Sequence, residues 1–94
     1  DLSIIIVNWN TRDMLRNCLA SIPGQDGLQK EIIVIDNASE DGSAAMVAGE
    51  FPDVRLIRNG ANLGFATATN QGLRAAGGRH LLRRTIQTPV SWPA

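Results

Sequence analysis

Cysteine and histidine are scarce in this sequence, with one of each among its 94 residues, and aromatic residues make up 4%. A single cysteine excludes a disulfide framework and a zinc site made of cysteines alone. With one histidine beside it, the usual mixed set of zinc ligands cannot be assembled either. We therefore expect neither a disulfide-stapled domain nor a zinc-dependent one.

The sequence also lacks a net charge, because nine Lys and Arg residues balance nine Asp and Glu residues. Nucleic-acid clamps and proteins that bind anionic membranes depend on surplus basic residues, so both classes are disfavoured. The apolar runs, such as Ile4–Val7, are far shorter than the ~20 residues of a membrane span. The composition, 44% hydrophobic, predicts one soluble, cytoplasmic domain.

Strand-like and helix-like segments alternate along the chain. Runs rich in Ile and Val predict strands, and the amphipathic segments between them predict helices. The strands are expected at 2–7, 31–35, 54–57 and from 80–82 onward, and the helices at 11–22, 39–51 and 64–76. This order predicts a three-layer α/β/α fold with a mainly parallel sheet. Because the first strand follows residue 1 directly, we expect a clipped or processed N-terminus.

The first predicted helix has an apolar stripe, which we expect to face the core. Its members are Met14, Leu15, Cys18, Leu19 and Ile22. Cys18 is thereby interpreted as a core cysteine and His80 as a strand-end histidine. Neither has a partner for nucleophilic catalysis.

Polar residues follow the first two predicted strands, where ligands of parallel sheets bind. Asp36 ends the second strand, and its carboxylate could accept hydrogen bonds from a ribose hydroxyl or a base N–H. The alternative is that Asp36 caps the next loop or helix. Trp9 follows the first strand and could stack on a base, or it could cover the open end of the core.

The segment Asn62–Ala66 begins the third predicted helix with Gly64. Free N–H groups at a helix start favour an anionic group such as a diphosphate, although glycine also starts helices for local reasons. Asn70 lies in the middle of that helix, which suggests a hydrogen bond to a neighbouring loop.

Taken in order, four segments resemble the N-terminal half of the family 2 glycosyltransferases, closest to rhamnosyltransferase-type members. The segments are 3–10, 31–43, 54–59 and 62–72, and the resemblance covers residues 2 to about 82. It implies a GT-A fold, Rossmann-like in its nucleotide-binding half. It also implies a nucleotide-diphosphate-sugar donor, UDP- or dTDP-linked, and transfer of the sugar to an acceptor hydroxyl in cell-envelope polysaccharide or glycolipid synthesis.

The resemblance carries over the residues of the donor pocket. Val7 and Trp9 would line the base pocket, and Asp36 would hydrogen-bond the base or ribose. The full set of positions implied to bind the nucleotide sugar is Val7, Trp9, Asp36, Asn37, Asn62, Gly64 and Asn70. No catalytic residue is implied in this chain, because the base of inverting members lies in the second half of the family's sequence.

The sequence departs from the family after the fourth strand. There the family has an acidic motif, typically Asn-Pro-Asp-Thr, that holds a divalent metal (Mg or Mn) on the diphosphate. This chain has no carboxylate after Asp53, so the metal ligands are absent from residues 83–94. Suitable codons for 83–93, read two bases later, give Ala-Asp-Asn-Pro-Asp-Thr-Arg-Leu-Leu-Ala. We therefore expect a partial donor-binding domain at 1–82 and an aberrant, out-of-frame tail at 83–94 that continues the fourth strand poorly.

Three other functions are alternatives. A receiver domain needs an acidic cluster, a phosphorylatable Asp at a later strand end and a lysine, whereas the third strand here ends in Arg58-Asn59 and Lys30 is the sole lysine. A dinucleotide-binding oxidoreductase needs a glycine-rich turn after the first strand, which is missing. A non-catalytic nucleotide-binding or interaction remnant remains open. Alone, the chain is expected to be inactive, and contact with the inner face of a membrane would involve parts outside it.

Overall fold

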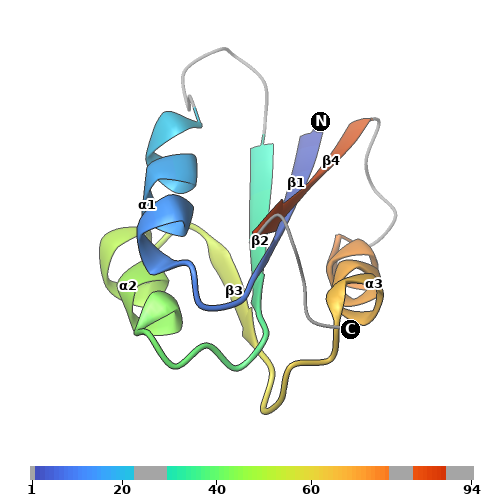
Figure 1. Cartoon of the computed structure of the whole chain (residues 1–94). Coiled ribbons are helices and arrows are strands. Elements are labelled where there is room, and N and C mark those ends of the chain that lie inside the picture. Colours follow the sequence, from blue (N-terminus) through green and yellow to red (C-terminus); the bar gives the residue numbers. More distant parts are fainter. Residues whose placement is uncertain (1, 23–29, 77–81, 89–94) are drawn as a thin grey trace.

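The computed structural model describes residues 2–22, 30–76 and 82–88. Strands and helices alternate in the order β1 (Leu2–Asn8), α1 (Arg12–Ser21), β2 (Lys30–Asp36), α2 (Ser43–Glu50), β3 (Arg55–Arg58), α3 (Phe65–Ala75) and β4 (Leu82–Thr88). The four strands form one parallel sheet in the order β3-β2-β1-β4. Helices α1 and α2 cover one face of this sheet and α3 covers the other (Figure 1). The expected three-layer α/β/α fold is confirmed.

The central strands β1 and β2 are apolar on both faces because both faces are covered by helices. Successive side chains of a strand point to opposite faces, so each strand supplies two cores. Ile4, Ile6 and Val34 pack with Leu15 and Val47 of α1 and α2. The alternate residues Ile5, Val7, Ile33 and Ile35 pack instead with Ala68 and Ala76 on the α3 side. The unbroken Ile/Val runs of the sequence follow from this double burial.

Helix α3 approaches the sheet closely at Gly72. A Cβ atom added there would lie 2.5 Å from Cγ2 of Ile5 and 2.9 Å from Cδ1 of Ile35. Glycine therefore sets the distance between α3 and the two central strands. That distance fixes where the start of α3 lies relative to the strand ends.

One residue of the apolar stripe predicted for the first helix does not face the core. Leu15 and Leu19 are buried, and Cys18 and Ile22 pack partly against the same core, as expected. Met14 is 52% exposed, so the prediction that it faces the core is wrong. It lies in the first turn of α1 and lines an open cleft, whereas the next residue, Leu15, is completely buried.

The fourth strand begins within the predicted limits and extends further than expected. Its backbone pairs with β1 from Leu82 opposite Leu2 to Thr88 opposite Asn8. The expectation of a poor continuation after residue 82 is therefore wrong for the backbone of 83–88. His80, Pro23-Gly24 and Gly77-Gly78 lie outside the described residues. Within the described ranges, no helix is both long and apolar enough to pass through a bilayer.

Candidate functional site at the carboxyl ends of β1 and β2

Two polar loops meet where β1 and β2 end. The parallel register places Asn8 opposite Asp36, and the Asn37 amide N–H donates to the Asn8 carbonyl oxygen at 2.9 Å. The strand pairing ends at these two residues, and a loop follows each of them. The polar residues predicted from the sequence to follow the two strands are thus neighbours.

The Asp36 carboxylate is 3% exposed and is held by three hydrogen bonds. Its Oδ1 accepts from Asn8 Nδ2 at 2.9 Å and from Ser39 Oγ at 2.7 Å. Its Oδ2 accepts from the Ser39 backbone N–H at 3.0 Å. A carboxylate oxygen has two lone pairs. Among the described residues, one acceptor position of Oδ2 is therefore left for a ligand. Asp36 thus organises the loop after β2, and its binding of a ligand stays a prediction.

Asn8 fastens the first loop to the second and was not among the predicted binding residues. Besides its bond to Asp36, its Nδ2 lies 3.2 Å from Ser39 Oγ, and its Oδ1 accepts from Thr11 Oγ1 at 2.7 Å. The side chain is completely buried. Its signal in the sequence was a polar residue at the end of an apolar strand. Its partner could be identified only once the strand register was known.

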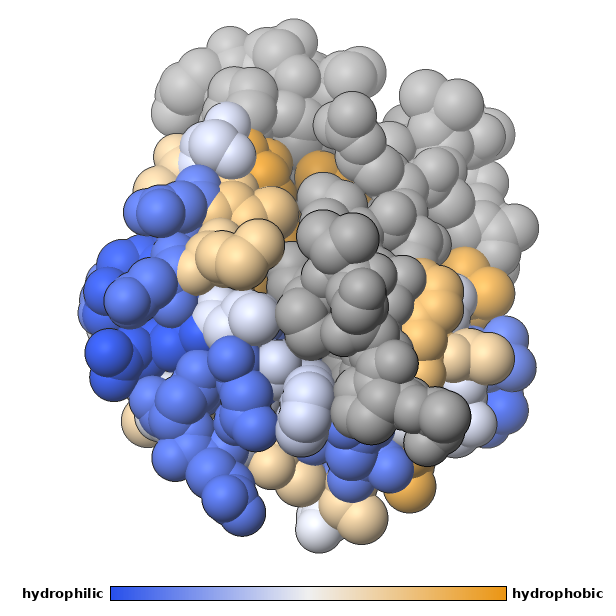
Figure 2. All heavy atoms as spheres, in the orientation of Figure 1, coloured by the Kyte–Doolittle hydropathy of each residue, from blue (hydrophilic) through white to orange (hydrophobic). Residues whose placement is uncertain are grey.

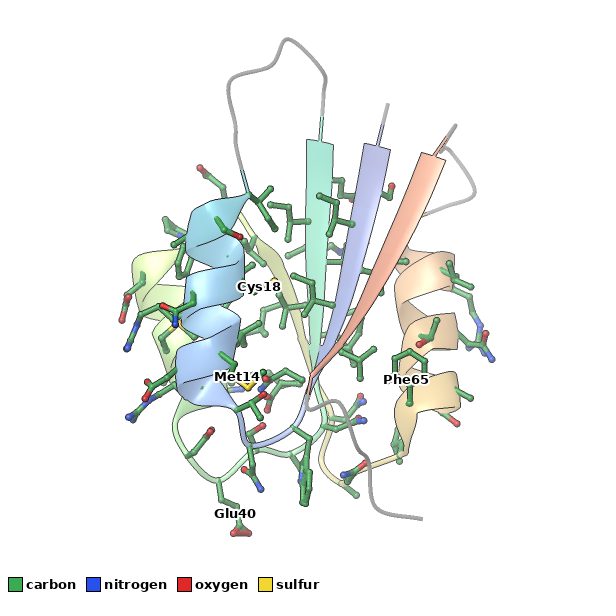
Figure 3. The ribbon with its side chains drawn as sticks, turned by 45° about the horizontal axis from the view of Figure 1, so that its top comes forward. Met14, Cys18, Glu40 and Phe65 are labelled. Carbon is green, nitrogen blue, oxygen red and sulfur yellow. The ribbon has the colours of Figure 1, made fainter. Side chains whose placement is uncertain are left out.

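Asn10 repeats this link closer to solvent. It has a φ of 52°, in the left-handed region that Asn tolerates better than most residues. Its backbone N–H donates to Ser39 Oγ at 2.9 Å, and its Oδ1 accepts from the Glu40 N–H at 2.7 Å. The Glu40 side chain itself points away from the sheet (Figure 3). The loop after β1 (residues 9–11) and the loop after β2 (residues 37–42) are therefore joined into one ordered surface, here called the ledge.

An open cleft lies beside this ledge, at the start of α1. Its volume is about 320 Å³, and its lining residues are Asn10, Thr11, Arg12, Asp13, Met14 and Asp41. Asp41 accepts from the Arg12 N–H at 2.8 Å and from the Ser43 N–H at 3.0 Å. Burial raises the pKa of Asp41, but hydrogen bonds from Ser43 and Arg12 outweigh it and hold the pKa below its ordinary value. The cleft wall thus carries an ionised carboxylate, within a hydrophilic surface that extends over α1 and α2 (Figure 2).

A third segment, the start of α3, is linked to the site by three side-chain amides, here called the amide set: Asn37, Asn59 and Gln71. Asn37 is completely buried and its Nδ2 donates to the Gly64 carbonyl oxygen at 3.1 Å. Its Oδ1 accepts from Asn59 Nδ2 at 2.8 Å. Asn59 in turn exchanges hydrogen bonds with Gln71 at 2.8 and 2.9 Å. The sequence did not single out Gln71, because one polar residue in an amphipathic helix carries no distinctive signal.

The start of α3 has a backbone shape that requires glycine. Gly64 has φ 83° and ψ 171°, a region open almost solely to glycine. Its N–H donates to Asn62 Oδ1 at 2.9 Å. The Gly64–Ala66 stretch therefore turns sharply into the helix, and the exposed Asn62 side chain supports the turn from outside.

The predicted binding residues fall into two groups. The structure brings Trp9, Asp36, Asn37, Asn62 and Gly64 to the same end of the sheet. Trp9 is half-buried and Asn37 is buried within the amide set, so Asn37 faces the protein rather than solvent.

Val7 and Asn70 stand apart from that group. The Val7 side chain has no exposed surface and packs in the α3-side core, and its backbone lies inside the sheet, paired with Ile35 of β2 and Gln87 of β4. Asn70 is exposed on α3, and its side chain makes no hydrogen bond with the described residues. The predicted bond from Asn70 to a neighbouring loop is therefore not found there; Gln71, the next residue, makes such a bond instead.

The described residues do not offer a metal site. Across 2–22, 30–76 and 82–88, no three His, Cys, Asp or Glu side chains come together in a way that could hold a metal ion. Asp36 and Asp41 are each engaged by neighbouring donors.

Comparison with known proteins bears on the whole chain. The family model "Glycosyl transferase family 2" matches residues 3–83. The succinoglycan biosynthesis protein ExoO of Rhizobium meliloti is 35% identical over 84% of this chain. An N-acetylglucosaminyl-diphospho-decaprenol L-rhamnosyltransferase of Mycobacterium tuberculosis is 32% identical over 81% of it.

A solved structure is similar as well. The mannosyltransferase PcManGT of Pyrobaculum calidifontis, in complex with GDP-Man and Mn²⁺, superposes with a TM-score of 0.68 at 30% identity over 79% of this chain. The expected GT-A fold is thereby confirmed. The chain spans about a quarter of the length of these proteins, 23% and 25% of the two relatives and 24% of the solved structure.

Proposed function

Because the chain belongs to the family 2 glycosyltransferases, we propose that it is the part of such an enzyme that holds a nucleotide-diphosphate-sugar donor. The observation that carries this proposal is the Asp36 carboxylate, buried at the strand ends and fixed by Asn8 and Ser39 with one acceptor position of Oδ2 left. A fixed acceptor of this kind suits a ribose hydroxyl or a base N–H.

The surrounding residues fit the same ligand. Trp9, half-buried on the ledge, offers an aromatic face for a base. The turn at Asn62 and Gly64 leads into α3, whose first N–H groups favour a diphosphate. Val7 would support the base pocket from within the core, Asn37 would act through its bond to Gly64, and Asn70 would contribute from the exposed side of α3. The donor is proposed to be UDP- or dTDP-linked.

The longer enzyme would transfer the sugar from this donor to an acceptor hydroxyl in cell-envelope polysaccharide or glycolipid synthesis. Relatives that make succinoglycan or use a polyprenyl-linked acceptor support this class of product. We place it in the cytoplasm, at the inner face of the membrane where lipid-linked acceptors lie. The chain by itself is proposed to be inactive, because catalytic base and acceptor site belong to the second half of the family's sequence.

Titration calorimetry of the 94-residue chain with UDP and dTDP tests the donor site. We expect saturable binding that Asp36→Asn weakens at least tenfold, because the new amide cannot accept at Oδ2. Asp53→Asn, an equal charge change at an exposed position before β3, should leave the affinity unchanged. Thermal melts of each variant show that it is folded. A folded wild-type chain that binds neither nucleotide would refute the donor-site assignment.

The runner-up function is a non-catalytic nucleotide-binding or interaction remnant, and the tail 83–94 bears on the choice. We propose that this tail is out of frame and that the acidic metal motif is encoded two bases away. Sequencing the gene decides the point. Codons that cannot yield Asn-Pro-Asp-Thr in the shifted frame would rule the frameshift out.

A further inference from the structure

The amide set behind the start of α3 does more than link two loops. Asn59 uses both N–H bonds of its side chain, one to Asn37 Oδ1 and one to Gln71 Oε1, each at 2.8 Å. Its own Oδ1 accepts from Gln71 Nε2 at 2.9 Å. Every hydrogen-bonding atom of the Asn59 amide is therefore engaged. Such a closed set holds one geometry, because any rotation of an amide breaks two bonds at once.

This set connects three elements that are distant in sequence. Asn37 follows β2, Asn59 follows β3, and Gln71 lies in the second turn of α3. The Asn59 backbone N–H also donates to the Asp36 carbonyl oxygen at 2.9 Å, so the set is joined to the carboxylate residue itself. The amide set reaches the start of α3 through the hydrogen bond that Asn37 donates to the Gly64 carbonyl oxygen. This oxygen also accepts from the Ala68 N–H at 3.3 Å.

Besides the Asn37 bond, Gly64 has the hydrogen bond from its N–H to Asn62 Oδ1 and no packing around its Cα. No heavy atom outside its chain neighbours lies within 4 Å of where its Cβ would be. Phe65, labelled on α3 in Figure 3, follows it directly. Packing of Phe65, Ala68 and Gly72 places α3 on the sheet. At Gly64 itself, the hydrogen bonds with Asn37 and Asn62 hold the peptide.

We propose that Asn59 and Gln71 are positioning residues of the donor site. They act through Asn37 to hold Gly64 and the first N–H groups of α3 at a set distance from Asp36. This inference rests on the proposed function and adds two residues to it. Neither residue needs to touch the nucleotide.

Two variants remove the set with little change in shape. Gln71→Met has a side chain of similar length without hydrogen bonds, and Asn59→Asp keeps the shape of Asn while losing both donated bonds. Arg55→Ala is the matched control, because Arg55 Nη1 donates to the Ala75 carbonyl at 2.9 Å and so anchors the opposite end of α3. All three changes remove contacts to the same helix.

Amide hydrogen exchange of the 94-residue chain, read by NMR, measures the positioning directly. In Gln71→Met and Asn59→Asp we expect exchange at Gly64 and Ala68 to quicken at least tenfold. Exchange at Ile5 and Val34 in the central strands should stay near wild type, and Arg55→Ala should leave Gly64 unchanged. A merely stabilising bond would quicken all four sites together, so equal acceleration, or none at Gly64, overturns the proposal.

The second measurement on these variants is their affinity for the nucleotide. We expect each variant to weaken UDP or dTDP binding about tenfold, and the double variant to be no more than about tenfold weaker, because both substitutions break the same set. A hundredfold loss in the double variant would mean independent contacts and would contradict positioning. If the wild-type chain binds neither nucleotide, the proposed function fails, and the exchange result still decides whether Asn59 and Gln71 hold Gly64.

Discussion

At the scale of single residues, the loop after β2 combines a buried carboxylate with a backbone conformation that alanine rarely adopts. Ala38 has a φ of 61°, between Asn37 and Ser39, whose side chains are both fixed by hydrogen bonds. Those bonds hold the turn in spite of the strain. The loop keeps this shape because Asp36 needs the Ser39 N–H and hydroxyl as donors.

Ala38→Gly should relieve that strain. A left-handed conformation costs an L-residue roughly 1–2 kcal/mol, and glycine's extra freedom in the unfolded chain offsets part of the gain. We expect the free energy of unfolding to rise by about 0.5–1 kcal/mol, measured by urea denaturation. Ala48→Gly, at an exposed position in α2, should lower it by about 1 kcal/mol. A loss of stability in Ala38→Gly would show that the turn is not strained.

At the scale of elements, the distance between α3 and the sheet decides whether Gly64 can reach Asn37. Gly72 permits that distance, since a methyl group there would overlap Ile5 and Ile35, both completely buried. The polar side of α3 also contributes to the placement of the helix, because Gln71 on that side is hydrogen-bonded to Asn59. Close packing and the amide set thus act on neighbouring residues of one turn.

Gly72→Ala should therefore destabilise the chain, although alanine is the better helix former. Overpacking of this kind costs roughly 1–3 kcal/mol. Gly49→Ala is the matched control, because its Cβ would meet nothing within 4 Å in α2. It should stabilise by about 0.5–1 kcal/mol. Thermal denaturation of the two variants should show shifts of opposite sign, and stabilisation by both would disprove the close contact.

At the scale of the whole molecule, β4 is an edge strand of the sheet, and its sequence lacks carboxylates. Its backbone is in register with β1 through Thr88, so residues 82–88 end beside Asn8, at the same edge as the candidate site. The end of β4 therefore lies beside the region where a diphosphate is proposed to bind. The described part of the present chain has no metal-binding cluster.

Replacing residues 83–92 with Ala-Asp-Asn-Pro-Asp-Thr-Arg-Leu-Leu-Ala should restore metal dependence. We expect Mn²⁺ to strengthen UDP or dTDP binding by about tenfold or more in the replaced chain, because the metal neutralises diphosphate charge. Mn²⁺ should leave binding to the present chain unchanged, and a replacement with both Asp residues changed to Asn should behave likewise. Calorimetric titrations with and without Mn²⁺ give the comparison. An equal Mn²⁺ effect in all three chains would contradict the role given to this segment.

The sequence by itself determined the alternation of strands and helices, because apolar periodicity reports burial directly. Ile/Val runs buried on both faces could belong only to central strands, and Asp36 at the end of such a run was identifiable as a candidate ligand-binding residue. The ordered segments also indicated the family, which the family model confirms over 3–83.

Tertiary structure alone decided which polar side chains meet. Asn8 and Asp36 are paired by strand register, and Asn37, Asn59 and Gln71 by the approach of α3 to the sheet. Hydrogen bonds between residues far apart in sequence depend on distances and angles that no local pattern encodes. The same holds for Met14, which belongs to the apolar stripe of α1 but lines an open cleft instead of the core.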